Sequence, residues 1–586
     1  MMCSAGEKKD MEHIDADEKQ AMDNMHVCSS WKPRKGGLRT MPFIIVNECF
    51  EKVGSYGILS IMILYLKNEY HMQTATAATI LFVWSAISNA MSILGAFLSD
   101  SYFGRFHLIL LGSISSFVGM TLLWSTALIP ELRPPSSESY NNNSATPPQL
   151  ALLFSSFALI SIGAGCIRPC SIAFGADQLQ IEHNSESDDR MLDTYFHWYY
   201  ASCGLSSILA LSVIVYIQDK LGWKVGFGVP AILLFLSALI FLLGSPYYVK
   251  VEPVKNSITT FVQVLVMAFK NRKLTFRLHH YYPTCDSHIL TPTHNLRWLN
   301  KACIVRDGER ESKPEDGSSS CTVEQVESVK GIVRAIPMWS TGIVMIVCMN
   351  QESFTNLRSN TMDRTLIGNF KIPAGSFGLF TIISLTIWIC FYDRIMVPLL
   401  SKYRGQSGGL SCKVRMGMGL LFGCASTATS GIVESIRRRE AIEEGVVKMS
   451  ALWLVPAQAL MGLGEGLNSI GQLELFYTCL PKTMSSFALA FYSLEVGVAD
   501  LVGSFIVDAV DMVTSKGGTH SWLSSDINKG HLDYYYGLLT FLGLINYLYF
   551  LLCSSAYGPI QPATNSESQV TDQDIENFDY MELHSS

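Results

Sequence analysis

Long apolar segments recur along this chain, and polar segments separate them. Each is about 20 residues or longer, enough to cross about 30 Å of hydrocarbon as a helix that rises about 1.5 Å per residue. The pattern predicts an all-α membrane protein with twelve transmembrane helices. We place the twelve spans at about residues 41–66, 75–99, 106–130, 150–174, 193–217, 224–245, 332–355, 373–400, 413–435, 450–478, 485–512 and 534–556.

A polar linker at residues 246–331 divides the spans into six and six. Equal halves are typical of transporters built from repeated bundles. We therefore expect one six-helix bundle over residues 36–245 and a second over 332–556. Within the linker, residues 255–270 and 293–304 have the apolar spacing of amphipathic helices.

Composition agrees with a membrane protein, because only 16% of the 586 residues are charged, against roughly a quarter in soluble domains. Residues 1–35 and the acidic tail 557–586 are polar and are predicted to be disordered. The fifteen Cys residues lie mostly singly in apolar runs, without metal-type spacing, and are expected to pack as small hydrophobes. No phosphate loop, zinc spacing or hydrolase elbow is present, so we expect no enzyme, no cofactor, no ATP-driven pump and no nucleic-acid partner.

Basic residues indicate the orientation in the membrane. Twelve Lys and Arg residues fall in the linker, and others precede the first span or lie in loops on the same side, such as Arg105. The positive-inside rule then places both termini in the cytosol, and we expect the plasma membrane. The run Arg437-Arg438-Arg439 falls on the opposite side, although neighbouring acids dilute it. Asn142 begins a possible glycosylation sequon on the predicted outer side.

The first span contains three ionisable residues within five positions, Glu48, Glu51 and Lys52. An unpaired charge within a bilayer costs roughly 2.5–3.5 kcal/mol on insertion scales, so we expect these side chains to face the interior of the protein. Two carboxylates that share a cation suit a proton relay. The alternative is an ion pair that only packs helices together.

Other polar residues within the spans are candidates for the solute site. Arg168 precedes Pro169 in the fourth span; it cannot lose its proton, but it can balance a carboxylate or bind an anion. Its alternative role is to reach toward Asp177, nine residues further on. Glu465 and Glu474 of the tenth span lie on opposite faces, and we place Glu474 in the cavity. The sequence leaves Glu465 without a role, and it leaves Glu495 and Asp500 open between function and ion pairing.

Several motifs occur in order and resemble one family. Glu48-Cys-Phe-Glu51-Lys52 is similar to the E-x-x-E-[R/K] motif of proton-coupled oligopeptide transporters. Gly95 to Phe106, with Asp100, Gly104 and Arg105, resembles the loop between spans two and three of the major facilitator superfamily. Further matches are Phe174-Gly-Ala-Asp-Gln178, Phe196-His-Trp-Tyr-Tyr200, Met362-Asp-Arg364 and Asn528-Lys-Gly-His-Leu-Asp533. On these residues the chain is identified as similar to the plant nitrate/peptide branch of that family.

The resemblance implies two six-helix bundles of major facilitator type that rock around a central cavity. It implies that Glu48, Glu51 and Lys52 couple protons and that Asp100, Gly104 and Arg105 form a conformational loop. Arg168 stands where the family commonly has Lys, and Glu474 matches an acid that pairs with this cation or contacts substrate. Tyr56, Trp339 and Gln351 complete the predicted substrate site.

The expected function is proton-coupled symport of a small anionic or zwitterionic solute, with nitrate as the first choice. Met349 stands where one nitrate-binding relative has His, so a His-based nitrate site is not expected. Peptides and plant hormone acids are the alternative solutes, and a solute sensor with slow transport is the alternative function. Expected partners are the solute, protons and membrane lipid; the sequence does not indicate an oligomeric state.

Overall fold

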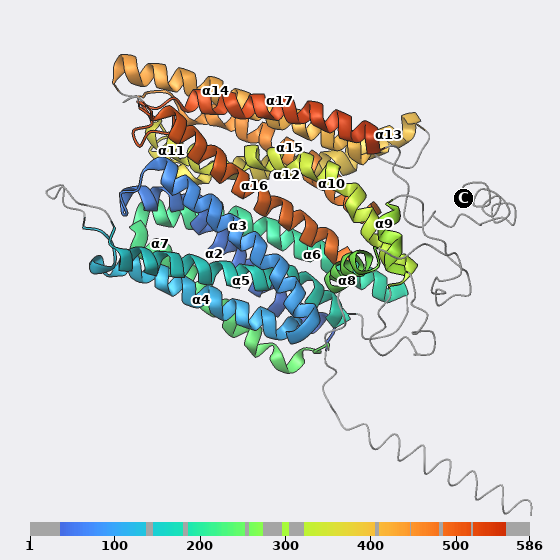
Figure 1. The fold of residues 1–586 in the computed structure, drawn as a ribbon. Helices are drawn as coiled ribbons and strands as arrows, with labels where there is room; N and C mark the ends of the chain where they lie inside the picture. The colour runs from blue at the N-terminus through green and yellow to red at the C-terminus, as the bar shows by residue number, and fades with distance from the viewer. Residues whose placement is uncertain are drawn as a thin grey trace, which may run out of the picture.

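A computed structural model of the chain describes residues 36–135, 145–179, 186–251, 257–272, 296–303, 321–404, 410–445, 447–479, 485–516 and 520–557. Nearly all of the described elements are helices that run side by side in two groups (Figure 1). The first group comprises α2 (Met41–Asn68), α3 (Thr74–Leu98), α4 (Arg105–Leu128), α5 (Pro147–Leu179), α6 (Glu186–Leu209) and α7 (Val215–Leu243). The second comprises α10 (Val323–Met349), α11 (Glu352–Thr361), α12 (Gly378–Phe391), α14 (Cys412–Glu444), α15 (Val455–Cys479), α16 (Ser485–Thr514) and α17 (Leu532–Tyr557).

The predicted twelve spans are confirmed. Nine described segments are long and apolar enough to cross a membrane. One of them, Thr194–Tyr247, contains two spans, because Gly222 adopts φ 76° inside α7 and the chain reverses there. The side chain of Gln218 donates to the Gly226 carbonyl at 3.3 Å, whereas a straight helix would separate residues eight apart by about 12 Å. The helices α15 and α16, which carry the buried acids, are the remaining two.

The seventh span differs most from its prediction. It begins nine residues before position 332, at Val323, where Thr322 and Gln325 form a capping box. It ends at Met349, and α11 follows after the break at Asn350 and Gln351. The chain then forms a small hairpin of β1 (Thr365–Ile367) and β2 (Phe370–Lys371).

Both expected linker helices lie partly within the described residues. They are α8 (Ser257–Lys270) and the short α9 (Arg297–Asn300). Both lie at the same end of the bundles as α13 (Val397–Arg404) and the C-terminal end of α17 (Figure 1). We call this end, which carries Met41 and α8, the linker end, and we call the opposite end, which carries Asn68 and Thr74, the distal end. Predicted disorder at residues 1–35 and in the tail after Tyr557 lies outside the described residues.

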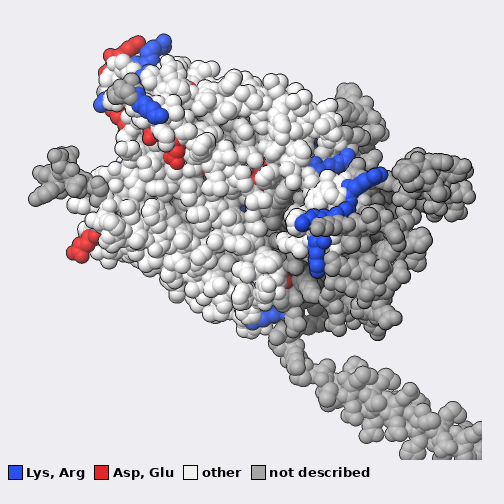
Figure 2. All heavy atoms as spheres, viewed as in Figure 1, with Lys and Arg blue, Asp and Glu red and all other residues white. Residues whose placement is uncertain are grey.

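The flank between the two ends is nearly free of charged side chains, which gather at the ends (Figure 2). Exposed Leu, Ile, Val and Phe side chains cover it, as a surface in contact with lipid requires. The two halves meet from the distal end to the middle of the spans. Among the described residues, hydrogen bonds and ion pairs between the halves include Lys67 to Ser525, Thr79 to Asp508, Ser85 and Asn89 to Asp500, Asn356 to Ser60 and Arg364 to Asp219. The conformation is therefore closed at the distal end.

Candidate coupling and substrate site

Close packing of α5 against α3 places Arg168. Pro169 has no N–H, so the carbonyl of Gly165 loses its helical hydrogen bond, and this carbonyl lies against Gly95 of α3. A Cβ at position 165 would lie 2.5 Å from the Cβ of Met91. Only glycine permits this approach of α5 to α3. The approach fixes the position of Arg168, which follows one turn later.

Arg168 and the three ionisable residues of α2 form one cluster. Lys52 Nζ lies 3.7 Å from Glu48 Oε1, and Arg168 Nη2 lies 3.9 Å from Glu51 Oε1. Ser55 donates to Glu51 Oε1 at 2.5 Å. The second oxygen of each carboxylate, Oε2, is buried without a hydrogen-bond partner in the described structure. Each acid therefore has one cation and one oxygen that is free to take a proton.

The cations of this cluster are accessible, whereas the carboxylates are not. Glu48 and Glu51 are 2% and 0% exposed, while the side chains of Lys52 and Arg168 are 21% and 33% exposed. The Arg168 guanidinium also lies 5.8 Å from the centre of the Tyr56 ring. A charged group in mid-span does not face lipid at low cost, so this accessible surface must face the interior of the protein. The face presented there is positively charged.

Glu474 has a different partner from the one that the resemblance implied. It forms an ion pair with Arg415 of α14, close to the linker end, and its side chain is 49% exposed. Arg168 pairs with Glu51 instead, on its own half of the molecule. Arg415 was not singled out in the sequence, because it lies among the basic residues of a predicted loop and its helix begins at Cys412.

Three further acids in α15 and α16, two of them buried and Glu465 partly buried, have neutral surroundings. Glu495 accepts from the amide of Gln472 at 2.6 and 2.7 Å and is packed against Gly342. Asp500 accepts from Asn350 at 2.6 Å. Glu465 lies near Tyr492 and has no hydrogen bond or ion pair to any residue that the structure describes. Neither Glu495 nor Asp500 forms the interhelical ion pair that the sequence left open for them.

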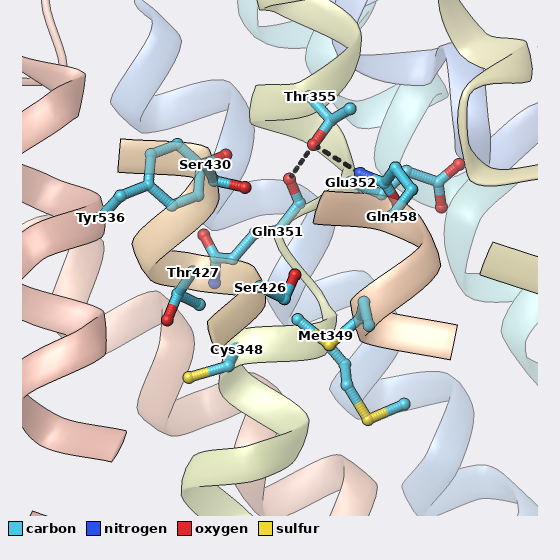
Figure 3. A pocket seen from close by; sticks show the side chains of 11 residues that line it. Cys348, Met349, Gln351, Glu352, Thr355, Ser426, Thr427, Ser430, Gln458 and Tyr536 are labelled. Carbon is cyan, nitrogen blue, oxygen red and sulfur yellow. Dashed lines mark hydrogen bonds between the residues drawn. The ribbon is translucent and has the colours of Figure 1, made fainter. Parts of the chain in front are cut away.

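Trp339 and Gln351 lie in other parts of the second half. The Trp339 indole donates to the Phe491 carbonyl at 3.0 Å and stacks on that ring. Gln351 lines a cavity of about 30 Å³, room for one or two waters, together with Glu352, Thr355, Ser426, Ser430 and Gln458 (Figure 3). Tyr535 donates to the Gln351 side chain at 3.1 Å. Neither residue contacts the Arg168 cluster in this conformation.

The predicted conformational loop is an ion-pair network. Gly104 adopts φ 75° between α3 and α4, a conformation that favours glycine. Arg105 then reaches back to Asp100 at 3.2 Å and across to Asp177 of α5 at 2.6 Å. Asp177 is therefore bound to Arg105, and the alternative in which Arg168 reaches toward it is not observed. The possible glycosylation site Asn142 lies outside the described residues.

Comparisons with known proteins agree with these features. The model of the POT family, PTR2, matches residues 106–523. Protein NRT1/PTR FAMILY 1.2 of Arabidopsis thaliana is 48% identical over 90% of this chain and 91% of its own length. Protein NRT1/PTR FAMILY 1.1 of the same plant is 46% identical over 93% and 95%.

Solved structures share the fold. The POT family transporter PepTSo superposes with a TM-score of 0.66 at 18% identity, covering 89% of this chain and 98% of its own. An auto-inhibited POT family peptide transporter gives 0.65 at 20% identity, covering 90% and 99%. The twelve spans, the charged motif of α2 and these relatives lead to one conclusion: the chain belongs to the POT family and is a proton-coupled membrane transporter of its NRT1/PTR branch.

Proposed function

We propose that this transporter carries a small anion, nitrate first, together with protons, and that the cluster around Arg168 binds both. The observation that supports this proposal is the charge balance of the cluster. Two carboxylates, Glu48 and Glu51, face two cations, Lys52 and Arg168, at 3.7 and 3.9 Å. The four charges sum to zero when no proton is bound.

A proton on either carboxylate leaves the cluster with one net positive charge. The partner cation is then no longer balanced, and it lies on the accessible side of the cluster. A monovalent anion beside Arg168 and Tyr56 restores neutrality, so proton and anion each favour binding of the other. Arg168 keeps its charge throughout and cannot itself carry the proton.

The orientation supports import of the anion into the cytosol. The linker end carries the exposed basic residues Lys270 of α8 and Arg297 of α9, and we assign it to the cytosolic side. The described chain begins and ends there, at Gly36 and Tyr557. Of the run Arg437-Arg438-Arg439, which argued against this assignment, Arg437 is wholly buried and pairs with Glu434 at 2.8 Å, and Arg438 donates to the Gly530 carbonyl at 2.6 Å. Of the three, Arg439 is the exposed one. The distal end then faces outward at the plasma membrane.

Asn142 should carry a glycan, and an Asn142→Gln variant should lose the mobility shift that glycosidase removes.

A zwitterion is the second candidate, because Glu465 has no cation among the described residues. One zwitterionic solute would place its ammonium group near Glu465 and its carboxylate near Arg168. Peptides fit this arrangement, and two of the solved relatives are described as peptide transporters. A hormone acid carries only the carboxylate and needs Arg168 alone.

The test is uptake in oocytes at outside pH 5.5 and 7.5, with labelled nitrate, dipeptides and hormone acids offered in turn. We expect acid-stimulated nitrate uptake that Glu48→Gln and Arg168→Gln abolish. Glu444→Gln, at an exposed distal position, controls for expression at the surface. Acid-stimulated uptake of a dipeptide but not of nitrate would refute the anion and favour the zwitterion. A Glu48→Gln variant that stops uptake but keeps a signalling response would favour a sensor.

A further inference from the structure

Asp500 is a buried acid in the contact between the two halves. It lies in the middle of α16 and is 1% exposed. Its Oδ1 accepts from Asn350 at 2.6 Å, at the end of α10, and its Oδ2 lies 3.5 Å from the amide of Asn89 on α3. Among the described acids that contact both halves, it lies nearest to the middle of its helix, and the proposed coupling at the Arg168 cluster does not use it.

The groups that face Asp500 are all neutral. They are the hydroxyl of Ser85 and the amide of Asn89 on α3, and the amide of Asn350 on α10. On α16 itself, the flanking acids Glu495 and Asp508 bind Gln472 and Thr79. No Lys or Arg of the described residues lies within ion-pair distance of Asp500. The carboxylates of Glu48 and Glu51, by contrast, each have a cation.

This environment favours the neutral acid. A carboxylate taken out of water without a cation carries a large desolvation cost, which two amide donors offset only in part. A carboxylic acid is cheaper to bury. Its Oδ1 still accepts from Asn350, and the new O–H donates to Ser85 or to the Asn89 oxygen once that amide rotates.

We propose that Asp500 is a second proton-binding site, whose protonation favours closure of the two halves at the distal end. The proposal rests on the proposed function, in which the two six-helix bundles rock around the central cavity. When the distal side opens, α3 and α16 separate, and Asp500 meets water as an ordinary carboxylate. A proton from the distal water binds one carboxylate oxygen before or as the halves close. By linkage, a proton held more tightly in the closed state stabilises that state.

The test is a distance measurement between the distal ends of α3 and α16 in the full chain, in lipid nanodiscs. Spin labels are attached through keto amino acids at Thr76 and Met512, both exposed, so the native cysteines do not interfere. Pulsed electron resonance then gives the fraction of molecules with the short, closed distance between pH 5 and pH 8. No solute is added, so failure of the nitrate proposal does not alter the result.

We expect the closed fraction to rise as pH falls in the parent chain. Asp500→Asn, which is isosteric and permanently neutral, should keep the closed fraction high at every pH. Asn89→Leu removes a donor to the ionised form, whereas the neutral acid can still donate to Ser85, so the variant should shift the midpoint to higher pH. Asp508→Asn, on the same helix and interface, should titrate as the parent does.

Two results would overturn the proposal. One is an Asp500→Asn variant that titrates as the parent does, which would place the titrating group elsewhere. The other is a closed fraction that falls on acidification and depends on Asp500, which would mean that the ionised form holds the halves together. An unchanged midpoint in Asn89→Leu would refute the role of Asn89 and leave Ser85 and Asn350 as the partners that sense protonation.

Discussion

Replacement of Glu51 by Gln tests whether the Arg168 cluster couples anion and proton. Gln keeps the size of the side chain and removes one negative charge 3.9 Å from the guanidinium. The variant therefore imitates the protonated cluster at every pH. We expect it to bind nitrate at pH 7.5 as well as the parent chain does at acid pH, and to lose the dependence of binding on pH between these values.

The magnitude follows from the ion pair that is removed. At 3.9 Å the attraction is about 4 kcal/mol at an effective dielectric constant of about 20, and about 1 kcal/mol in bulk water. Arg168 is partly accessible, so the true value lies between these limits. Since about 1.4 kcal/mol corresponds to tenfold in affinity, nitrate should bind between about sixfold and about a thousandfold more tightly at pH 7.5.

The assay is nitrate titration of the purified full chain, followed by thermal stabilisation at pH 5.5 and 7.5. Glu474→Gln is the matched control, because that acid pairs with Arg415, and its nitrate affinity should keep the pH dependence of the parent chain. A Glu51→Gln variant that binds nitrate no more tightly than the parent chain at pH 7.5 would refute the charge-balance mechanism. Uptake by the same variant should lose its acid stimulation even though binding is strong.

Three further predictions follow from other contacts. Gly165→Ala should lower the thermal stability of the purified protein, because the new Cβ would lie 2.5 Å from the Cβ of Met91. Overpacking of this kind costs about 1–3 kcal/mol. Unchanged stability would show that α3 and α5 move apart freely. Asp177→Asn breaks the ion pair with Arg105 at 2.6 Å, so it should slow uptake at saturating solute. Nitrate affinity should stay within about twofold, because nine residues of α5, about 13 Å of helix, separate Asp177 from Arg168. Burial raises the pKa of Cys303 to about 12 and of Cys321 to about 11. Neither thiol should therefore react with maleimide at pH 7.5 until the chain is unfolded. Rapid labelling of either would show that the packing around these two residues opens.

The fold could be predicted from the sequence because the hydropathy signal of the twelve spans is strong. Runs of about 20 apolar residues have few alternatives to transmembrane helices. Boundaries were less certain where polar residues continue a helix beyond the membrane. The seventh span begins nine residues before position 332 because the capping box at Thr322 starts the helix within the polar linker. Hydropathy cannot detect that start, although the Thr-x-x-Gln spacing could have indicated it.

The site was predictable only where its partners are close in sequence. Glu48 and Lys52 are one turn apart, so their pairing could be expected from spacing. The pairs Arg168 with Glu51 and Glu474 with Arg415 join different helices. Their choice of partner depends on how the helices pack, which no local pattern encodes. Ser55, which donates to Glu51, lies four residues after it and could have been found by the same spacing.

The buried acids of this transporter fall into two groups that respond differently when the halves move. Glu51 and Arg168 lie on α2 and α5, both in the first half, so rocking of the halves does not separate them. Proton affinity at Glu51 must therefore be altered by the anion itself, as the charge balance requires. Asp500 has partners on both halves, and movement changes its surroundings directly. Because the two sites respond to different events, Glu51→Gln should alter nitrate affinity and Asp500→Asn the closed fraction, and the effects on each quantity should add in the double variant.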